Sequence, residues 1–352
     1  MEITEAIATV TAPAGLNEDE AFTVMEEIMG GKATDAQIAA LIAALRVKGE
    51  TEAEIAGFAR AARAGAAKVT VNCDQLLDTC GTGGDMANTF NISTATAFVV
   101  AACGVKVAKH GNRSISSKCG SADVLEALGV KLDLSPAAAA GALEKTGITF
   151  MFAPLFHSAM KHAVKARREI GIRTIFNLLG PLSNPAGANC QLIGVYKPEY
   201  TLTMGKVLLR LGVKRALVVH GAGGLDEIST LGSTRITEVA EKRIRNYEIE
   251  PGMYGLPKAS AEELQGGAPG ENASLLLRIF AGEPGPARNI VVLNAAAALY
   301  AAGIFTSIGE GIKPACHAID SGEAGLKLER LKRYTSEVTG KEAGAEQLCS
   351  TA

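Results

Sequence analysis

Residues 78–94, "DTCGTGGDMANTFNIST", separate a predicted strand from a predicted helix and place three glycines within four positions, at Gly81, Gly83 and Gly84. Glycine tolerates positive φ and has no Cβ, so the backbone N–H groups of this loop can approach an anion closely. The apolar run "ATAFVVAA" that follows predicts a helix whose first turn contains Asn91 and Ser93, and a helix N-terminus favours phosphate. The stretch fits either a phosphate-binding loop or a strand-to-helix turn with capping side chains. It matches neither G-x-G-x-x-G nor G-x-x-x-x-G-K-[ST].

A second polar loop, "KHGNRSISSKCGSAD", runs from Lys109 to Asp123 and follows the predicted strand "VKVAKH". It combines two cations, Lys109 and Arg113, with a glycine, an amide and several serines. Ligands of open α/β sheets collect beyond the carboxyl ends of the strands, and both loops lie at such ends. Two converging anion-binding loops predict a ligand with more than one phosphate.

A third loop, "AGGLDEIST", follows the predicted strand "RALVVHG" and carries the adjacent acids Asp226 and Glu227. Taken alone, these acids fit either exposed loop carboxylates or ligands of Mg²⁺, which binds a few carboxylates and completes its coordination with water and substrate phosphates. The hydroxyl of Ser93 is a further candidate ligand. Beside two phosphate-binding loops, the magnesium interpretation is favoured.

Alternating strands and helices from about residue 75 predict a largely parallel sheet with helices on its faces. The first seventy residues predict a small helical bundle, because helix-start signals recur at Asn17, Thr34 and Thr51. Residues 234–251 alternate polar and apolar like an antiparallel ribbon. Gly and Pro gather at residues 266–270 and 282–286, which predict surface loops, and the stretch from 266 to 286 is expected to lie away from the motifs. The predicted fold class is α/β, with a small N-terminal α-helical domain and a large α/β domain whose mostly parallel central sheet is flanked by helices.

Composition limits the cellular context and the partners. The chain has 352 residues, 47% of them hydrophobic, and a formal net charge of −2, which predicts no nucleic-acid or membrane partner. Its seven cysteines are scattered without a C-x-x-C pair, its N-terminus is acidic, and no uninterrupted apolar run approaches 18 residues. These features predict a cytoplasmic protein without a disulfide framework.

Taken in order, the polar blocks resemble the anthranilate phosphoribosyltransferases, a family related by fold to the pyrimidine nucleoside phosphorylases. The matching blocks are "GTGGD…TFNIST", "KHGNRSISS", "GSADVLEALG", "RTIFNLLGPLSNPA" and "HGAGGLDEIS", with "IMGGKATDAQIAALIAALRVKGET" in the helical part. The resemblance extends from about Glu18 to beyond Gly311. It implies Mg²⁺-dependent transfer of phosphoribose from 5-phosphoribosyl 1-diphosphate to the amine of anthranilate, with release of pyrophosphate, in L-tryptophan biosynthesis.

The resemblance also implies roles for individual residues. Those expected to bind the phosphoribosyl diphosphate are Gly81, Gly84, Asp85, Thr89, Asn91, Ile92, Ser93, Thr94, Lys109, His110, Gly111, Asn112, Arg113, Ser114, Ile115, Ser116, Ser117 and Ser121. Those expected to contact anthranilate are Gly81, Asn112 and Arg167. Those expected to hold magnesium are Ser93, Asp226 and Glu227. His110 receives no firm role, and the other four histidines are interpreted as structural.

The same resemblance implies a homodimer in which residues 1–70, with about 160–186 packed on them, form an α-helical dimerisation domain. Residues 71–159 and 187–352 are then expected to form the α/β domain that binds phosphoribosyl diphosphate. The chemistry agrees with the residues, since an aniline nitrogen is neutral at pH 7 and needs no strong base. We therefore assign no general base and expect Lys109 to act electrostatically on the leaving pyrophosphate. Two alternatives stay open: a pyrimidine nucleoside phosphorylase-type transferase, and a non-catalytic homologue that binds nucleotides or nucleic acid.

Overall fold

The computed structural model describes residues 1–12, 15–85, 87–114 and 118–350, with side chains described as far as residue 340. Three of the predicted diphosphate-binding residues, Ile115, Ser116 and Ser117, lie outside the described residues. Among the described residues, no helix is both long enough and apolar enough to cross a membrane.

The N-terminal part of the chain is helical, as predicted. Its helices are α1 (Ile3–Thr11), α2 (Glu18–Met29), α3 (Asp35–Lys48) and α4 (Glu52–Ala64). Side chains of Asn17, Thr34 and Thr51 accept hydrogen bonds from the first turns of α2, α3 and α4, which confirms the three predicted starts. The structure adds α1, whose N-cap Glu2 is not one of the favoured capping residues.

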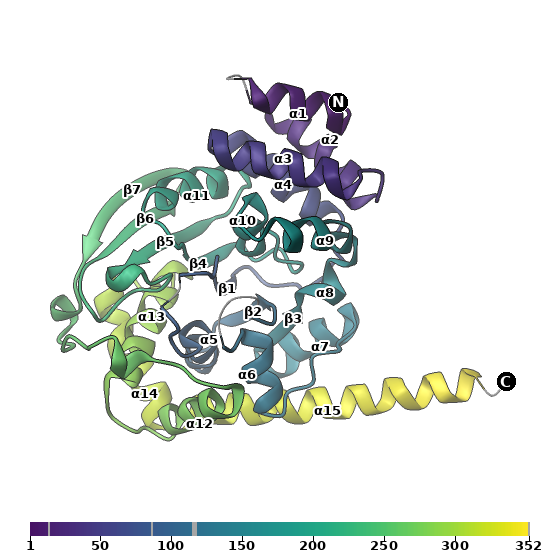
Figure 1. The fold of residues 1–352 in the computed structure, drawn as a ribbon. Helices are drawn as coiled ribbons and strands as arrows, with labels where there is room; N and C mark the ends of the chain where they lie inside the picture. Colours follow the sequence, from purple (N-terminus) through teal and green to yellow (C-terminus); the bar gives the residue numbers. More distant parts are fainter. Residues whose placement is uncertain (13–14, 86, 115–117, 351–352) are drawn as a thin grey trace.

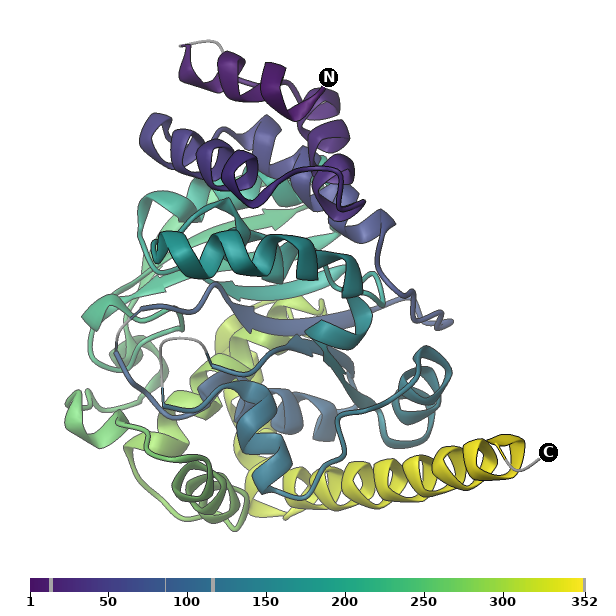
Figure 2. The same ribbon diagram turned by 45° about the vertical axis from the view of Figure 1, so that its right-hand side comes forward.

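Two later helices, α9 (Lys161–Ile170) and α10 (Ile175–Leu182), share the hydrophobic core of the N-terminal helices. Phe58 of α4 meets Phe176 of α10 edge to face, with ring centroids 6.4 Å apart. We call α1–α4 together with α9 and α10 the helical unit; it lies along one side of the sheet in Figures 1 and 2. Chain segments from both ends of the first half of the sequence therefore build one core.

A seven-stranded sheet with the order β3-β2-β1-β4-β5-β6-β7 forms the centre of the molecule. The first five strands in this order are parallel, and the β5–β6 and β6–β7 pairs are antiparallel. This confirms the predicted mostly parallel sheet and its antiparallel ribbon. The strands are β1 (Leu76–Gly81), β2 (Lys106–Gly111), β3 (Ile148–Phe152), β4 (Cys190–Gly194), β5 (Arg215–Gly221), β6 (Thr234–Ala240) and β7 (Arg243–Ile249).

Helices cover both faces of this sheet because strand side chains alternate in direction. Val218 of β5 packs with the helical unit and α11, whereas its neighbours Leu217 and Val219 pack with the helices on the opposite face. The helices outside the helical unit are α5 (Ile92–Ala102), α6 (Ser121–Ala127), α7 (Pro136–Thr146), α8 (Ala153–Phe156), α11 (Glu199–Arg210), α12 (Pro269–Phe280), α13 (Pro286–Ala301), α14 (Ile308–Asp320) and α15 (Glu323–Ser350). The end of α15 extends beyond the body of the molecule in Figures 1 and 2.

The three polar loops leave the same edge of the sheet. The strands β1, β2 and β5, which precede them, run parallel to one another and end at Gly81, Gly111 and Gly221. Carboxyl ends of parallel strands meet at one edge, where open α/β sheets bind ligands. The fold therefore directs the loops that follow these strands to one region.

Candidate active site

Asp226 lies directly against the glycine loop. Its Oδ2 accepts a hydrogen bond of 2.8 Å from the backbone N–H of Gly83. A Cβ on Gly81 would lie 2.2 Å from the same oxygen, and one on Gly194 would lie 1.5 Å from the Asp226 carbonyl oxygen. In this structure, the missing side chains at Gly81 and Gly194 make room for the loop that carries Asp226.

The start of α5 is held by residues from three other segments. The backbone N–H of Ser93 donates to Glu227 Oε1 at 3.1 Å, so an acid from the third loop occupies this helix N-terminus. The side chain of Asn91 does not cap the helix; its Nδ2 donates to the carbonyl oxygen of Cys119 at 3.1 Å, and its Oδ1 accepts from Asn272 Nδ2 at 2.9 Å. The alternative in which Asn91 only caps the helix is wrong.

Lys109 connects the first two loops beneath the surface. Its side chain is only 3% exposed, and its Nζ donates to the carbonyl oxygen of Thr79 and, at 3.2 Å, to Ser93 Oγ. The ammonium therefore lies between the end of β1 and the start of α5. We call the Gly83 and Ser93 N–H groups, Lys109, Asp226 and Glu227 the anion-binding cluster.

Burial and mutual repulsion perturb the acids of this cluster. Burial, together with the nearby Asp85, raises the pKa of Asp226 to about 7. Burial also raises the pKa of Glu227 well above its usual value; Asp226 adds to this effect and Lys109 opposes it. The two acids thus resist ionising while no cation is bound, because one ammonium only partly offsets their burial and mutual repulsion.

The neighbouring carboxyl groups of Asp226 and Glu227 raise the question of whether a divalent cation fits here. In the described part of the chain, no group of three or more His, Cys, Asp and Glu side chains is arranged to hold a metal ion. Mg²⁺ needs less than that, since one or two carboxylates with substrate phosphates satisfy it. Asp226 and Glu227 supply the carboxylates and Ser93 a hydroxyl, so the predicted residues fit this cation.

The loop after β2 folds onto the start of α6. Ser121 Oγ donates to the Asn112 carbonyl oxygen at 3.3 Å, and the Ser114 N–H donates to Asp123 Oδ2 at 3.1 Å. The guanidinium of Arg113 pairs with Asp123 at 3.0 Å and with Glu126 at 2.7 Å. Any contact of Arg113 with a phosphate therefore has to compete with two carboxylates, and its predicted role stays a prediction.

The remaining predicted diphosphate-binding residues lie around the same loops. Asp85 Oδ1 accepts from the Ala87 N–H at 3.2 Å, and Thr89 forms an antiparallel bridge with Gln265. Ile92 and Thr94 are buried, and the hydroxyl of Thr94 has no hydrogen-bond partner in the described structure. A Cβ on Gly111 would lie 2.3 Å from Ser121 Oγ, so this glycine lets α6 approach.

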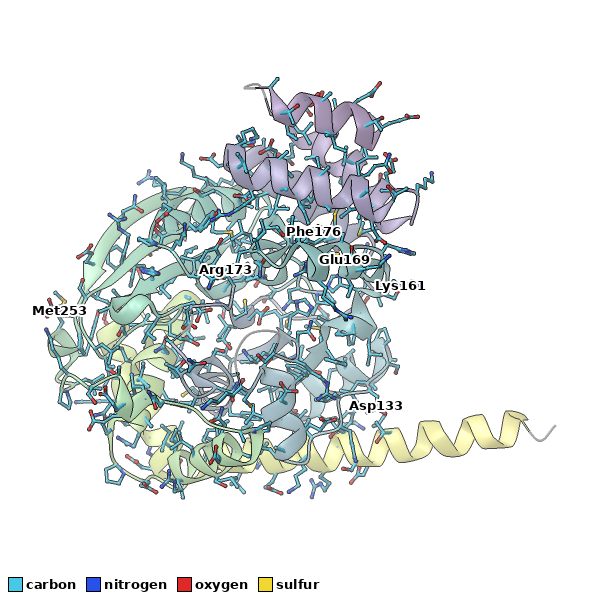
Figure 3. The ribbon with its side chains drawn as sticks, viewed as in Figure 1. Asp133, Lys161, Glu169, Arg173, Phe176 and Met253 are labelled. Atoms are coloured by element: carbon cyan, nitrogen blue, oxygen red, sulfur yellow. The ribbon has the colours of Figure 1, made fainter. Side chains whose placement is uncertain are left out.

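Arg167 lies on the helical unit, away from the anion-binding cluster. Its guanidinium packs 5.0 Å from the ring centroid of Phe176, and burial lowers its pKa. Within the described ranges its guanidinium makes no hydrogen bond or ion pair, and no hydrogen bond joins Arg167 to Gly81 or Asn112. The structure therefore leaves this cation unpaired and links none of the three predicted anthranilate residues by a hydrogen bond. Phe176, the ring against which Arg167 packs, is labelled in Figure 3.

Two buried histidines form a pair that sequence reasoning missed. The rings of His110 and His157 lie 5.0 Å apart, and Nδ1 of His110 lies 3.1 Å from the Gly180 carbonyl oxygen. Burial lowers the pKa of His110 to about 3 and also lowers that of His157. Both Nε2 atoms are buried without a hydrogen-bond partner among the described residues. Such orphaned atoms in neutral imidazoles are unusual in a purely structural pair.

The Gly/Pro-rich residues 266–286 do not lie away from the motifs. The Gly266 N–H donates to the Asn88 carbonyl oxygen at 2.8 Å, and Asn272 of α12 binds Asn91. The predicted loop at residues 266–270 becomes the start of α12 at Pro269. The expectation of remoteness is wrong because composition reveals exposure and turns, but not which distant segment a turn contacts.

Comparison with known proteins gives a consistent result. Residues 4–66 match the helical bundle domain of the glycosyl transferase family, and residues 73–325 match its a/b domain. Anthranilate phosphoribosyltransferase of Acetivibrio thermocellus is 54% identical over 332 residues, covering 94% of this chain and 96% of the relative. The enzyme of that name from Syntrophobacter fumaroxidans is 52% identical over 335 residues, covering 95% and 99%.

Solved structures agree with the sequences. Anthranilate phosphoribosyltransferase from Thermus thermophilus superposes with a TM-score of 0.90 at 46% identity, covering 94% of this chain and 99% of that one. The Saccharomyces cerevisiae enzyme in complex with PRPP and Mg superposes with a TM-score of 0.87 at 27% identity, covering 95% and 98%. The same yeast enzyme has been solved with 4-fluoroanthranilate, with a TM-score of 0.86 at 26% identity, covering 95% and 98%.

Proposed function

Because this chain belongs to the anthranilate phosphoribosyltransferases within the glycosyl transferase family, we propose that its site transfers the 5-phosphoribosyl group of 5-phosphoribosyl 1-diphosphate to the amine of anthranilate. The products are N-(5-phosphoribosyl)anthranilate and pyrophosphate, and the reaction belongs to L-tryptophan biosynthesis. One observation carries this assignment to the site: Gly83, Ser93, Lys109, Asp226 and Glu227 are joined by hydrogen bonds at one edge of the sheet.

The reaction breaks the bond between the sugar C1 and the diphosphate, so negative charge grows on the leaving group while the sugar gains oxocarbenium character. The Lys109 ammonium and the N–H groups of Gly83 and Ser93 are positioned to stabilise that negative charge. Magnesium, held by Asp226, Glu227 and Ser93, would add positive charge at the leaving diphosphate. The acids would then exchange their present N–H partners for the cation and leave those donors to the phosphates.

The acceptor is proposed to bind between Arg167 and the loop after β2. The unpaired guanidinium of Arg167 suits the anthranilate carboxylate, because it can donate two parallel hydrogen bonds. If Nδ1–H of His110 donates to the Gly180 oxygen, its Nε2 is the acceptor and is directed at no protein partner in the described structure. An imidazole with so low a pKa orients an amine N–H rather than removing its proton. This agrees with a reaction that needs no strong base.

The same proposal extends to organisation and location. We assign residues 1–70, with about 160–186, to an α-helical domain that forms a homodimer, and residues 71–159 and 187–352 to the domain that binds phosphoribosyl diphosphate. The shared core of α1–α4, α9 and α10 supports grouping these helices. We further assign the protein to the cytoplasm, with anthranilate and 5-phosphoribosyl 1-diphosphate as its small-molecule partners.

A fluorescence assay tests the proposed function. The protein is mixed with Mg²⁺, 5-phosphoribosyl 1-diphosphate and anthranilate, and the fluorescence of anthranilate is followed. We expect it to decay only when all components are present, to stop when the metal is chelated, and to resume when Mg²⁺ is restored. No decay, or metal-independent phosphorolysis of a pyrimidine nucleoside by the same preparation, would favour the alternatives.

A further inference from the structure

We propose that Arg173 is a further binding residue for the diphosphate group of the sugar donor, brought to the glycine loop by the helical unit. Arg173 lies in the short connection between α9 and α10; it opens the "RTIFNLLGPLSNPA" block but belongs to none of the sets of site residues predicted above. Its Nε lies 2.9 Å and its Cζ 3.2 Å from the place where a Cβ on Gly84 would be. The guanidinium thus packs against the backbone of the loop that is proposed to hold the diphosphate.

The arginine is held there by an aromatic side chain that is itself fixed. Cζ of Arg173 lies 4.5 Å from the ring centroid of Tyr196, within cation–π range. Tyr196 is buried; its N–H donates to Thr82 Oγ1 of the glycine loop at 3.1 Å, and its ring lies 5.3 Å from that of Tyr200. Tyr196 therefore fixes the glycine loop and positions the guanidinium beside it. Figure 3 shows Arg173 where the helical unit borders the sheet.

The hydrogen-bonding capacity of Arg173 is unused. Throughout the described part of the chain its guanidinium has no ion pair and no hydrogen bond, although Arg113 and Arg60 each pair with two carboxylates. The face of the Tyr196 ring balances the guanidinium charge only partly, and it accepts no hydrogen bond from the guanidinium N–H groups. A cation held next to an anion-binding loop with free N–H groups is the arrangement that recognises phosphate.

The other charged groups of the site are mostly acids, so a bound diphosphate needs further cations. Asp85, Asp226 and Glu227 crowd carboxyl groups around the loop, and the buried Lys109 offsets only part of their repulsion. A bound diphosphate would add further negative charge, which Arg173 beside Gly84 could balance. Because Arg173 comes from the helical unit, a ligand bound to it would also join the two parts of the molecule. This inference rests on the proposed function.

Equilibrium binding separates the two claims. Titration calorimetry measures the affinity of Mg²⁺–pyrophosphate and of Mg²⁺–phosphoribosyl diphosphate for wild type, Arg173→Gln, Arg173→Lys and the control Arg168→Gln, which removes an exposed arginine of α9. We expect Arg173→Gln to weaken both ligands about 10- to 100-fold, Arg173→Lys to weaken them by about 3- to 10-fold, and Arg168→Gln to leave them unchanged. The Michaelis constant for anthranilate should not change in any of these variants.

The outcomes distinguish the inference from the function. Unchanged affinity for both diphosphates in Arg173→Gln, or an effect confined to anthranilate, overturns the role of Arg173. Failure of wild type to bind either diphosphate overturns the proposed function instead. If Arg173→Gln has a lowered thermal midpoint without ligand, the comparison relies on Arg173→Lys, which keeps the charge but not the planar fork; wild-type affinity in that variant contradicts recognition by the guanidinium.

Discussion

The two ends of the proposed site differ in how their charged groups are paired. At the donor end, which we define as the anion-binding cluster, the chain's own acids already accept from the Gly83 and Ser93 N–H groups, and Lys109 donates to Thr79 and Ser93. At the acceptor end, which we define as Arg167, His110 and His157, the guanidinium and both Nε2 atoms have no hydrogen-bond partner among the described residues. The polar groups of the donor end are already paired with one another, whereas these three groups of the acceptor end are unpaired in the described structure.

This difference indicates two kinds of binding. A ligand at the donor end must exchange partners with the protein, because the donors it needs are occupied by carboxylates. A ligand at the acceptor end meets no such exchange, because the histidines are already buried, Arg167 is partly buried, and their free groups have no hydrogen-bond competitor among the described residues. We expect the donor end to depend on a cation that draws the acids away, and the acceptor end to depend on individual hydrogen bonds.

The largest effect is expected from neutralising the acids. The double variant Asp226→Asn with Glu227→Gln should reduce kcat/KM by roughly 10³-fold or more at low Mg²⁺, since both carboxylates proposed to hold the cation are lost. Its thermal midpoint at pH 8 should be at least as high as that of wild type. The folded-state pKa of Asp226 is raised to about 7, so the stability of the acid form is present at low pH and is lost as pH rises through 7.

A matched control for this variant is Asp133→Asn with Glu169→Gln, which neutralises two exposed acids seen in Figure 3. This control should retain wild-type activity at every Mg²⁺ concentration, measured with the fluorescence assay. Full activity of the Asp226/Glu227 variant at low Mg²⁺ would mean that the donor end is not a cation site. A large fall in its thermal midpoint would instead show that the acids stabilise the loops.

A smaller and more selective effect is expected at the acceptor end. Arg167→Gln should raise the KM for anthranilate about 10- to 100-fold, because a charge-assisted bidentate pair is lost, and should barely change the KM for the donor. Initial rates with each substrate varied in turn measure both constants, and Arg168→Gln again serves as the exposed control. Equal increases for both substrates would remove Arg167 from the acceptor end and weaken the contrast between the two ends.

The sequence allowed the donor end to be predicted better than the acceptor end. Strand alternation and strand ends placed the loops of Gly81, Lys109 and Asp226 at one edge, because parallel strands leave a sheet in a common direction. Helix caps at Asn17, Thr34 and Thr51 were predictable from local chemistry alone. Both kinds of signal can be recognised in a single sequence, because a helix cap depends on residues close along the chain and the position of a strand end depends on the topology of the sheet.

The missed features depend on partners that only the folded chain brings together. α10 was not predicted because "IFNLLGPL" is buried on nearly all sides and contains Pro181, so it has no polar face to mark a helix. Each missed residue contacts a motif residue that is distant in sequence: His157 packs on His110, Asn272 binds Asn91, and Arg173 packs against Gly84. Only the "RTIFNLLGPLSNPA" block offered a signal for Arg173, through the resemblance and not through any local pattern.

The smallest expected effect concerns stability at the acceptor end. Burial lowers the pKa of His110 to about 3 in the folded protein, whereas an unfolded histidine titrates near 6.5. A depressed folded-state pKa contributes stability that is present above the unfolded value and is lost as pH falls toward the folded value. Wild type should therefore lose roughly 1.4 kcal/mol per pH unit from this histidine below about pH 6, and His157 acts in the same direction.

The variant that isolates this term is His110→Asn, whose amide can still donate to the Gly180 oxygen in place of Nδ1. Free energies of unfolding in urea at pH 7, 6 and 5 measure the dependence, and His317→Asn removes an exposed histidine as the control. We expect His110→Asn to be less stable than wild type at pH 7 but to lose about 1–2 kcal/mol less between pH 7 and pH 5. Parallel pH profiles of wild type and His110→Asn would show that His110 is not held neutral. The acceptor end would then tolerate a charged imidazolium, and the contrast with the donor end would be lost.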